Sequence, residues 1–177
     1  MRHTNINVIT HQWLLDVLTP KSVVVDATMG NGHDTLFLSE HAHRVYAFDI
    51  NPQAYANTKH KVQHQTNVIL ILDGHENMLH HIKEPLDGVV FNCGYLPGGD
   101  RSSTTKQGTT IQALMHAKTL LKHDGWLCIT VYTGHPHGKQ EAHAVYNWLQ
   151  DHVHIKKQYT YPGVLNAPIA YFATLKK

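Results

Sequence analysis

Short apolar runs alternate with longer amphipathic segments along the chain, and this alternation is typical of an α/β fold. The apolar runs, rich in Val, Ile, Leu and Phe, predict strands at residues 22–27, 44–50, 68–73, 87–92, 126–132, 155–161 and 169–175. The amphipathic segments predict helices at residues 10–18, 32–40, 52–65, 76–82, from about 109, and at 139–150. The repeated order of strand, helix and strand predicts a mostly parallel sheet that helices cover.

The first and last strands refine this prediction. Residues 22–27 are apolar on both faces, as expected of a central strand with helices on each side. The connection between 155–161 and 169–175 has no helix and permits an antiparallel hairpin but not a parallel crossover. We therefore predict a Rossmann-like α/β fold: a seven-stranded, mostly parallel sheet with an antiparallel C-terminal strand and helices on both faces. Residues 1–177 form a single domain in this prediction, with residues 1–20 as its helical lead-in.

A glycine-rich turn between the first predicted strand and the first helix is the strongest candidate for a ligand site. It reads Asp-Ala-Thr-Met-Gly-Asn-Gly-His-Asp at residues 26–34. In open α/β sheets, ligands bind beyond the carboxyl ends of the strands, and glycines let the backbone turn sharply and approach the ligand. The residues of this turn that we expect to bind a cofactor are Asp26, Gly30, Asn31, Gly32 and Asp34.

Acidic residues that end the second and third predicted strands indicate the kind of cofactor. Asp49 can accept hydrogen bonds from both ribose hydroxyls of a nucleoside. Asp73, followed by Gly74 and His75, can accept the exocyclic amine of adenine. Helix capping is the other explanation for both carboxylates. A dinucleotide site usually has a third glycine, whereas this chain has Thr35 at that position.

These positions favour S-adenosylmethionine (SAM) as the cofactor. SAM has no phosphate, and its amino-acid tail carries an ammonium and a carboxylate. We expect Asp26 near the ammonium, backbone N–H groups near the carboxylate, and Asp34 as a support of the turn. Gln53, just after the second strand, completes the expected cofactor-binding residues. An NAD-dependent enzyme and a nucleotide-binding module without catalysis stay open as alternatives.

The loop after the fourth predicted strand is the candidate target site. It reads Asn-Cys-Gly-Tyr-Leu-Pro-Gly-Gly-Asp at residues 92–100 and is similar to the Asn-Pro-Pro-Tyr loop of amino-methyltransferases, with Cys-Gly in place of the two prolines. In that loop the Asn orients the nucleophilic nitrogen and the aromatic ring stacks on the target, roles that we expect of Asn92 and Tyr95. His135 or Tyr132, at the end of the fifth strand, can help to remove a proton from an amine or line the pocket.

Composition adds weaker constraints. The formal charge is +2 and the sequence pI about 8.5, which permits a nucleic-acid partner without requiring one. Tyr95 and Tyr132 belong to the expected substrate surface, and Arg101, Lys106 and Lys139 can contact phosphates on it. Lys156 and Lys157 can add to this phosphate-binding surface if they lie on the same face of the protein as Lys139.

The rest of the composition concerns metals, redox state and location. The 17 histidines lack the spacing of a metal site, so no metal is expected. Cys93 and Cys128 lie in apolar runs and are expected to be buried free thiols. Without a long apolar run or a signal-peptide pattern, we expect a cytoplasmic protein that does not bind a membrane.

With these residues in hand, the chain resembles the small bacterial family of putative rRNA methylases from about Val23 onward. The shared motifs are Asp-Ala-Thr-x-Gly-Asn-Gly-x-Asp-Thr-Leu-Phe-Leu at 26–38, Asp-Gly-His-Glu-Asn at 73–77, Phe-Asn-x-Gly-Tyr-Leu-Pro at 91–97 and Thr-Thr-Ile-Gln-Ala at 109–113. Asn166-Ala167-Pro168 is similar to the family's closing His-Ala-Pro, with Asn in place of His.

The resemblance implies a class I SAM-dependent methyltransferase. It also implies that the substrate is the 5-aminomethyl group of the tRNA wobble (2-thio)uridine, which becomes 5-methylaminomethyl. The expected partner is the anticodon arm of a tRNA, whose splayed base Tyr95 can stack upon, and a homodimer is a further expectation. A methyltransferase that acts on rRNA or on a small amine is the alternative.

Overall fold

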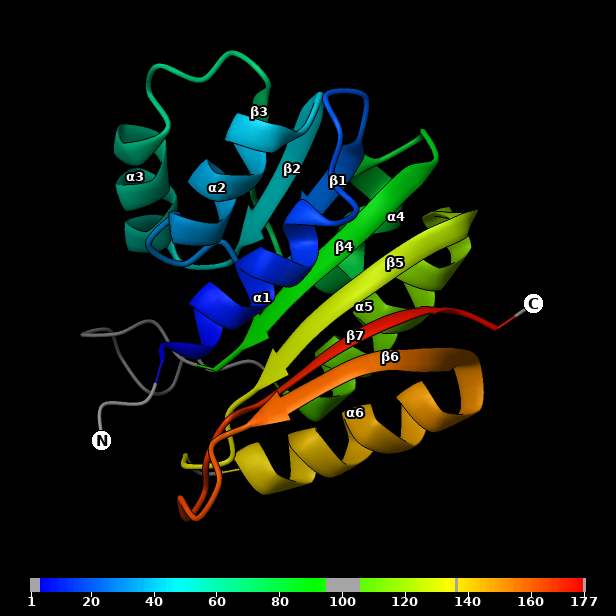
Figure 1. The fold of residues 1–177 in the computed structure, drawn as a ribbon. Helices are drawn as coiled ribbons and strands as arrows, with labels where there is room; N and C mark the ends of the chain where they lie inside the picture. The colour runs from blue at the N-terminus through cyan, green and yellow to red at the C-terminus, as the bar shows by residue number, and fades with distance from the viewer. Residues whose placement is uncertain (1–3, 95–105, 136, 177) are drawn as a thin grey trace.

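A seven-stranded sheet forms the centre of the protein, and helices cover both of its faces (Figure 1). The computed structural model describes residues 4–94, 106–135 and 137–176. The strands are β1 (Val23–Asp26), β2 (Arg44–Asp49), β3 (Val68–Leu72), β4 (Leu86–Cys93), β5 (Leu121–Val131), β6 (Val153–Thr160) and β7 (Ile169–Leu175). The helices are α1 (Ile6–Leu15), α2 (His33–His41), α3 (Pro52–Lys61), α4 (Met78–His81), α5 (Gln107–Leu120) and α6 (Gly138–His152), with a 3-10 turn η1 (His75–Asn77) before α4.

The strand order is β3-β2-β1-β4-β5-β7-β6. Strands β1 to β5 pair in parallel, and β7 pairs antiparallel with both β5 and β6. This topology confirms the predicted fold, including the antiparallel C-terminal strand. The chain order reverses between β1 and β4, and in such sheets the loops that leave the strands at the reversal point open a crevice for ligands. We call the end of the sheet where β1, β2, β4 and β5 finish the carboxyl edge.

Two apolar cores lie on the two faces of the sheet. On one face, Leu14 of α1 and Leu38 of α2 pack with Val24, Val45 and other strand residues. On the opposite face, residues of α5 and α6 such as Leu114 and Leu149 pack against the other side of the same strands. Because β1 is buried on both faces, its carboxyl end is held rigidly between the two cores.

Several predicted boundaries were wrong. Helix α1 begins at Ile6 rather than at residue 10 because Asn5 caps it, and the Asn5 side chain accepts the backbone N–H of Asn7 at 3.0 Å. Strand β5 begins at Leu121 rather than at residue 126, since the polar run 122–124 hides its start from the apolar pattern. The helix predicted at 76–82 is divided into η1 and α4, and α3 ends at Lys61 rather than at residue 65.

Two predictions from composition can be compared with the structure. Cys93 and Cys128 are both buried and neither forms a disulfide, as expected. In the part of the chain that the structure describes, no helix is both long and apolar enough to cross a bilayer.

Candidate functional site

The glycine turn is fixed between the end of β2 and helix α3. Gly30 and Gly32 both have left-handed backbones, with φ of 50° and 76°. The N–H of Gly30 donates to Asp49 Oδ2 at 3.0 Å, and the carbonyl of Gly30 accepts from Thr58 Oγ1 at 3.0 Å. A Cβ on Gly32 would lie 2.9 Å from Thr58 Oγ1. The turn therefore has one well-defined shape, and that shape requires glycine at position 32.

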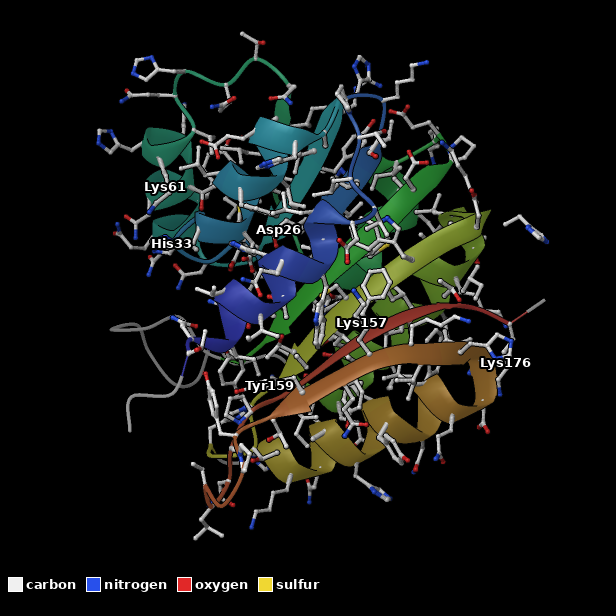
Figure 2. The ribbon with its side chains drawn as sticks, in the orientation of Figure 1. Asp26, His33, Lys61, Lys157, Tyr159 and Lys176 are labelled. Atoms are coloured by element: carbon white, nitrogen blue, oxygen red, sulfur yellow. The ribbon has the colours of Figure 1, made fainter. Side chains whose placement is uncertain are left out.

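Asp26 stabilises this turn from inside the protein. It ends β1 in the middle of the sheet (Figure 2), and the whole of Asp26 is buried. Its carboxylate accepts the backbone N–H of Thr28 at 3.1 Å and the hydroxyl of Thr35 at 2.6 Å. Burial, followed by the nearby Asp34 charge, raises the pKa of Asp26 to about 7. Both oxygens serve the turn itself, so a contact between Asp26 and a cofactor ammonium stays a prediction.

A row of side-chain amides joins the turn to α3. Asn31 Oδ1 accepts from Asn57 Nδ2 at 3.0 Å, and Asn57 Oδ1 accepts from Gln53 Nε2 at 2.8 Å. The predicted residues Asn31 and Gln53 thus lie in one network through Asn57, which the sequence analysis missed. Asp49 lies beside this row at the carboxyl edge, where its Oδ1 accepts the N–H of Asn51 at 2.9 Å.

Asp73 is engaged by its own local segment. Its carboxylate accepts from the side chains of His81 and Asn77, both at 2.8 Å, and from the N–H of Gly74 at 2.7 Å. The bonds from His81 and then Asn77 lower the pKa of Asp73. Asp73 does not cap a helix, because Gly74 is the N-cap of η1 and Asn77 that of α4, so the capping alternative is wrong, and the contact with adenine stays a prediction. His75 is buried with Nδ1 2.9 Å from the Ala27 carbonyl, and burial lowers its pKa.

Asn92 is the centre of a second polar group at the carboxyl edge. Its backbone N–H donates to Thr28 Oγ1 at 2.7 Å, which fixes the end of β4 against the glycine turn. Its Nδ2 donates to Asp34 Oδ2 at 3.2 Å and to Asn7 Oδ1 at 3.4 Å. The other oxygen of Asp34, Oδ1, is 2.6 Å from Nε2 of His11. We call Asn92, Asp34, His11, Asn7 and Tyr132 the Asn92 centre.

Tyr132 completes the Asn92 centre from the end of β5. Its hydroxyl is hydrogen-bonded to Asn92, and burial together with the charge of Asp34 raises its pKa to about 12. The phenol therefore stays protonated at neutral pH, and its role in removing a proton from an amine stays a prediction. The ring also packs against Gly94, where a Cβ would lie 3.2 Å from Tyr132 Cδ2.

Helix α1 contributes two further residues to this centre, His11 and Asn7, that were not predicted from the sequence. His11 bonds to Asp34 and stacks on Phe37 of α2 with ring centroids 3.9 Å apart and an interplanar angle of 8°. Asn7 lies one turn earlier on the same helix. No motif marks these two residues, because they reach Asn92 only through the packing of α1 on the sheet.

The remaining predicted site residues are spread over the loops of the carboxyl edge. Tyr95 and Arg101 lie outside the described residues. Lys106 is exposed and directly precedes α5. His135 is buried and Lys139 is exposed, and both line a cavity of about 320 Å³ between the β5–α6 loop and the β6–β7 connection.

Lys157 does not belong to the same surface as Lys139. Its ammonium is 2.8 Å from Asp16 Oδ2 and 6.0 Å from the centroid of the Phe172 ring, on the face of the sheet that α1 covers. Figure 2 shows Lys157 on β6, away from the ends of the strands. Lys139 starts α6 on the opposite face, so the sheet separates the two lysines.

Comparison with known proteins agrees with this geometry. Residues 45–168 match the family described as putative rRNA methylase. A putative rRNA methylase of Clostridium thermocellum is 34% identical with a TM-score of 0.89, over 99% of this chain and 100% of that one. A putative methyltransferase of Streptococcus mutans, solved in complex with SAH, is 36% identical with a TM-score of 0.87, over 99% and 100% of the two chains.

A curated relative also matches over most of this chain. The chloroplastic tRNA (mnm5s2U34)-methyltransferase of Arabidopsis thaliana is 34% identical over an alignment of 145 residues that covers 73% of this chain and 53% of the relative. The chain thus spans about half the length of that relative. With a matching fold, a glycine turn at the sheet reversal and these sequence matches, the chain belongs to the putative rRNA methylase family of SAM-dependent methyltransferases.

Proposed function

We propose that this protein methylates the 5-aminomethyl nitrogen of the wobble uridine of tRNA and produces the 5-methylaminomethyl form. The observation that carries the proposal is the Asn92 centre, in which an amide and a carboxylate lie together at the carboxyl edge beside the glycine turn. The name of the curated relative, a tRNA methyltransferase for this nucleotide, supports the same substrate.

The residues of the glycine turn fit SAM. Gly30 and Gly32 hold the turn in left-handed conformations, with Gly32 packed closely against Thr58 of α3, and Asp49 ends β2 where a ribose would lie. The amide row from Asn31 to Gln53 would border the nucleoside on its α3 side. When bound there, SAM supplies a methyl group on a positively charged sulfur.

The Asn92 centre is suited to hold and deprotonate an amine. Because Nδ2 of Asn92 donates to Asp34, its Oδ1 is oriented to accept an N–H from the substrate. An aliphatic ammonium has no free lone pair, so it must lose one proton before it attacks. We propose that Asp34, paired with His11, accepts that proton. The nitrogen then forms a bond to the methyl carbon while the carbon–sulfur bond breaks, and the sulfur keeps the electron pair.

Methylation of defined RNA tests the proposal. Purified protein with labelled SAM is expected to methylate tRNA whose wobble uridine carries 5-aminomethyl, and mass spectrometry of the nucleosides is expected to find the methylaminomethyl form. Asn92→Ala is expected to lower the rate by roughly 100-fold through misalignment, while calorimetry finds unchanged SAM binding. Asn147→Ala, which changes an exposed asparagine of α6, is the matched control.

Three outcomes would contradict the proposal. Transfer to rRNA or to a small amine with none to this tRNA would make the substrate wrong. Tight binding of NAD with none of SAM would make the cofactor wrong, and SAM binding without transfer to any acceptor would indicate a binding module. The anticodon arm as the bound region, a homodimer and a cytoplasmic location stay predictions.

We also propose that residues 1–177 act as one domain. The two cores share the strands of one sheet, which supports folding as a unit. A single cooperative unfolding transition by both fluorescence and circular dichroism is the expected result.

A further inference from the structure

The cavity beside the Asn92 centre has the chemistry of an anion site. It is lined by Thr133, Gly134, His135, His137, Lys139, Gln140 and Asn166. These residues belong to the β5–α6 loop, the first turn of α6 and the β6–β7 connection. Thr133 of the lining directly follows Tyr132 of the Asn92 centre in the chain, so the two sites share the loop that leaves β5.

The described lining is rich in hydrogen-bond donors. Lys139 carries a positive charge, His137 is exposed beside it, and Gln140 and Asn166 bear side-chain amides. None of the described lining residues has a carboxylate, and Glu141, the acidic residue next in sequence, is buried and accepts from Thr110 at 2.6 Å. A negatively charged group in the cavity would therefore contact hydrogen-bond donors, and no carboxylate of the described lining would repel it.

The backbone around the cavity holds an unusual conformation. Among the described residues other than glycine, the two with left-handed backbones are His137, with φ of 66°, and Asn166, with φ of 55°. Both line this cavity, one from the start of α6 and the other from the β6–β7 connection. Residues other than glycine adopt this conformation at a cost, and such residues concentrate at ligand sites. The β5–α6 loop and the β6–β7 connection thus each contribute one residue in this conformation to the cavity.

We propose that this cavity binds a backbone phosphate of the RNA substrate, next to the nucleotide that enters the Asn92 centre. The inference rests on the proposed function. An RNA brings a phosphate on each side of its target nucleoside, and phosphate contacts fix register without reading sequence. The lining offers the ammonium of Lys139 with the side-chain amides of Gln140 and Asn166, and a phosphate accepts hydrogen bonds from such donors. Lys139 is then a positioning residue for the RNA and takes no part in methyl transfer.

Steady-state kinetics at several salt concentrations test the inference. The substrate is an anticodon stem-loop RNA whose wobble uridine carries 5-aminomethyl, and the variant is Lys139→Ala. We expect KM for the RNA to rise about fivefold to tenfold with kcat within about twofold, because one phosphate contact is lost. The slope of log KM against log salt should fall in magnitude by about 0.7, the value for one phosphate of a single strand. Lys118→Ala, an exposed lysine of α5, is the matched control.

A chemical change on the RNA sharpens the test. Methylphosphonate linkages, which are uncharged, replace in turn the phosphates on either side of the wobble nucleotide. One of these RNAs should raise KM for the wild type as much as Lys139→Ala does, and should have little further effect on Lys139→Ala. Unchanged SAM binding by calorimetry verifies that the variant is folded.

The two proposals fail in different ways. If the wild type methylates the stem-loop but Lys139→Ala matches Lys118→Ala in both KM and salt slope, the phosphate site is wrong and the proposed function stands. If the wild type binds SAM and methylates no RNA, the proposed function is wrong, and the phosphate site is overturned with it. A loss of kcat rather than a rise in KM in Lys139→Ala would also overturn the positioning role.

Discussion

The glycine turn and the Asn92 centre lie at the same edge of the sheet but are built in opposite ways. The residues of the turn form one continuous segment, and its shape is fixed by hydrogen bonds that Thr28 and Thr35 donate to Asp26 and that Gly30 donates to Asp49 of β2. The Asn92 centre is assembled from α1, α2, β4 and β5. The cofactor end of the site is therefore one sequence motif that β2 and α3 hold in place, whereas the residues of the target end come together only through the packing of four elements. Substitutions in the glycine turn should therefore weaken SAM binding, whereas substitutions in the Asn92 centre should lower turnover.

The largest expected effect is on turnover, at Asp34. Asp34→Asn removes the carboxylate that we propose as proton acceptor, and kcat at neutral pH should fall by roughly 100-fold to 1,000-fold. SAM affinity should stay within a few fold, because the turn keeps its hydrogen bonds to Asp26 and Asp49. Rapid-quench kinetics and calorimetry measure the two quantities. Asp124→Asn, at an exposed aspartate, is the control. Equal loss of SAM binding and of kcat would mean that Asp34 belongs to the cofactor end.

A smaller effect, on binding, is expected at Gly32. Gly32→Ala places a Cβ near Thr58 in a left-handed conformation, which costs about 1–2 kcal/mol. The turn should shift, and SAM affinity should fall by about tenfold in calorimetry. Gly108→Ala on α5, where nothing lies within 4 Å of the added Cβ, is the matched control and should leave affinity unchanged. If Gly32→Ala binds SAM as the wild type does, the shape of the turn is less restrictive than its geometry indicates.

The smallest expected effect is a pH dependence of stability that arises from Asp26. Its pKa is 3.8 ordinarily and about 7 in the folded protein, because of burial and of Asp34. Between these values the folded chain keeps a proton that the unfolded chain loses. The contribution of Asp26 to stability is thus present at low pH and is lost as the pH rises toward 7. Asp26→Asn does not titrate, so its melting temperature relative to wild type should increase from about pH 5 to about pH 8. A constant difference across this range would contradict the raised pKa.

The sequence predicts the cofactor end of this protein better than its target end. The periodicity gave the strands of the sheet, and the glycine motif lies at its predicted place with Asp49 hydrogen-bonded to it. Asn92 is also at the expected strand end. His11 and Asn7 were missed because a contact between residue 7 and residue 92 depends on how α1 packs, which no local pattern encodes. Asp73 ends β3 at the position expected of an adenine ligand, but its bonds to Asn77 and His81 depend on how the following segment folds back, which the strand pattern does not encode.

The place of β7 between β5 and β6 has a consequence for how the protein folds during synthesis. The ribosome completes β6 before it makes β7, yet β6 lies at the edge of the sheet and joins it only through β7. For the time needed to make residues 161–175, β6 is a strand without its partner. Unpaired strands aggregate readily, and charged side chains on them oppose this. Lys156 and Lys157, in the middle of β6, would protect the nascent chain during that interval.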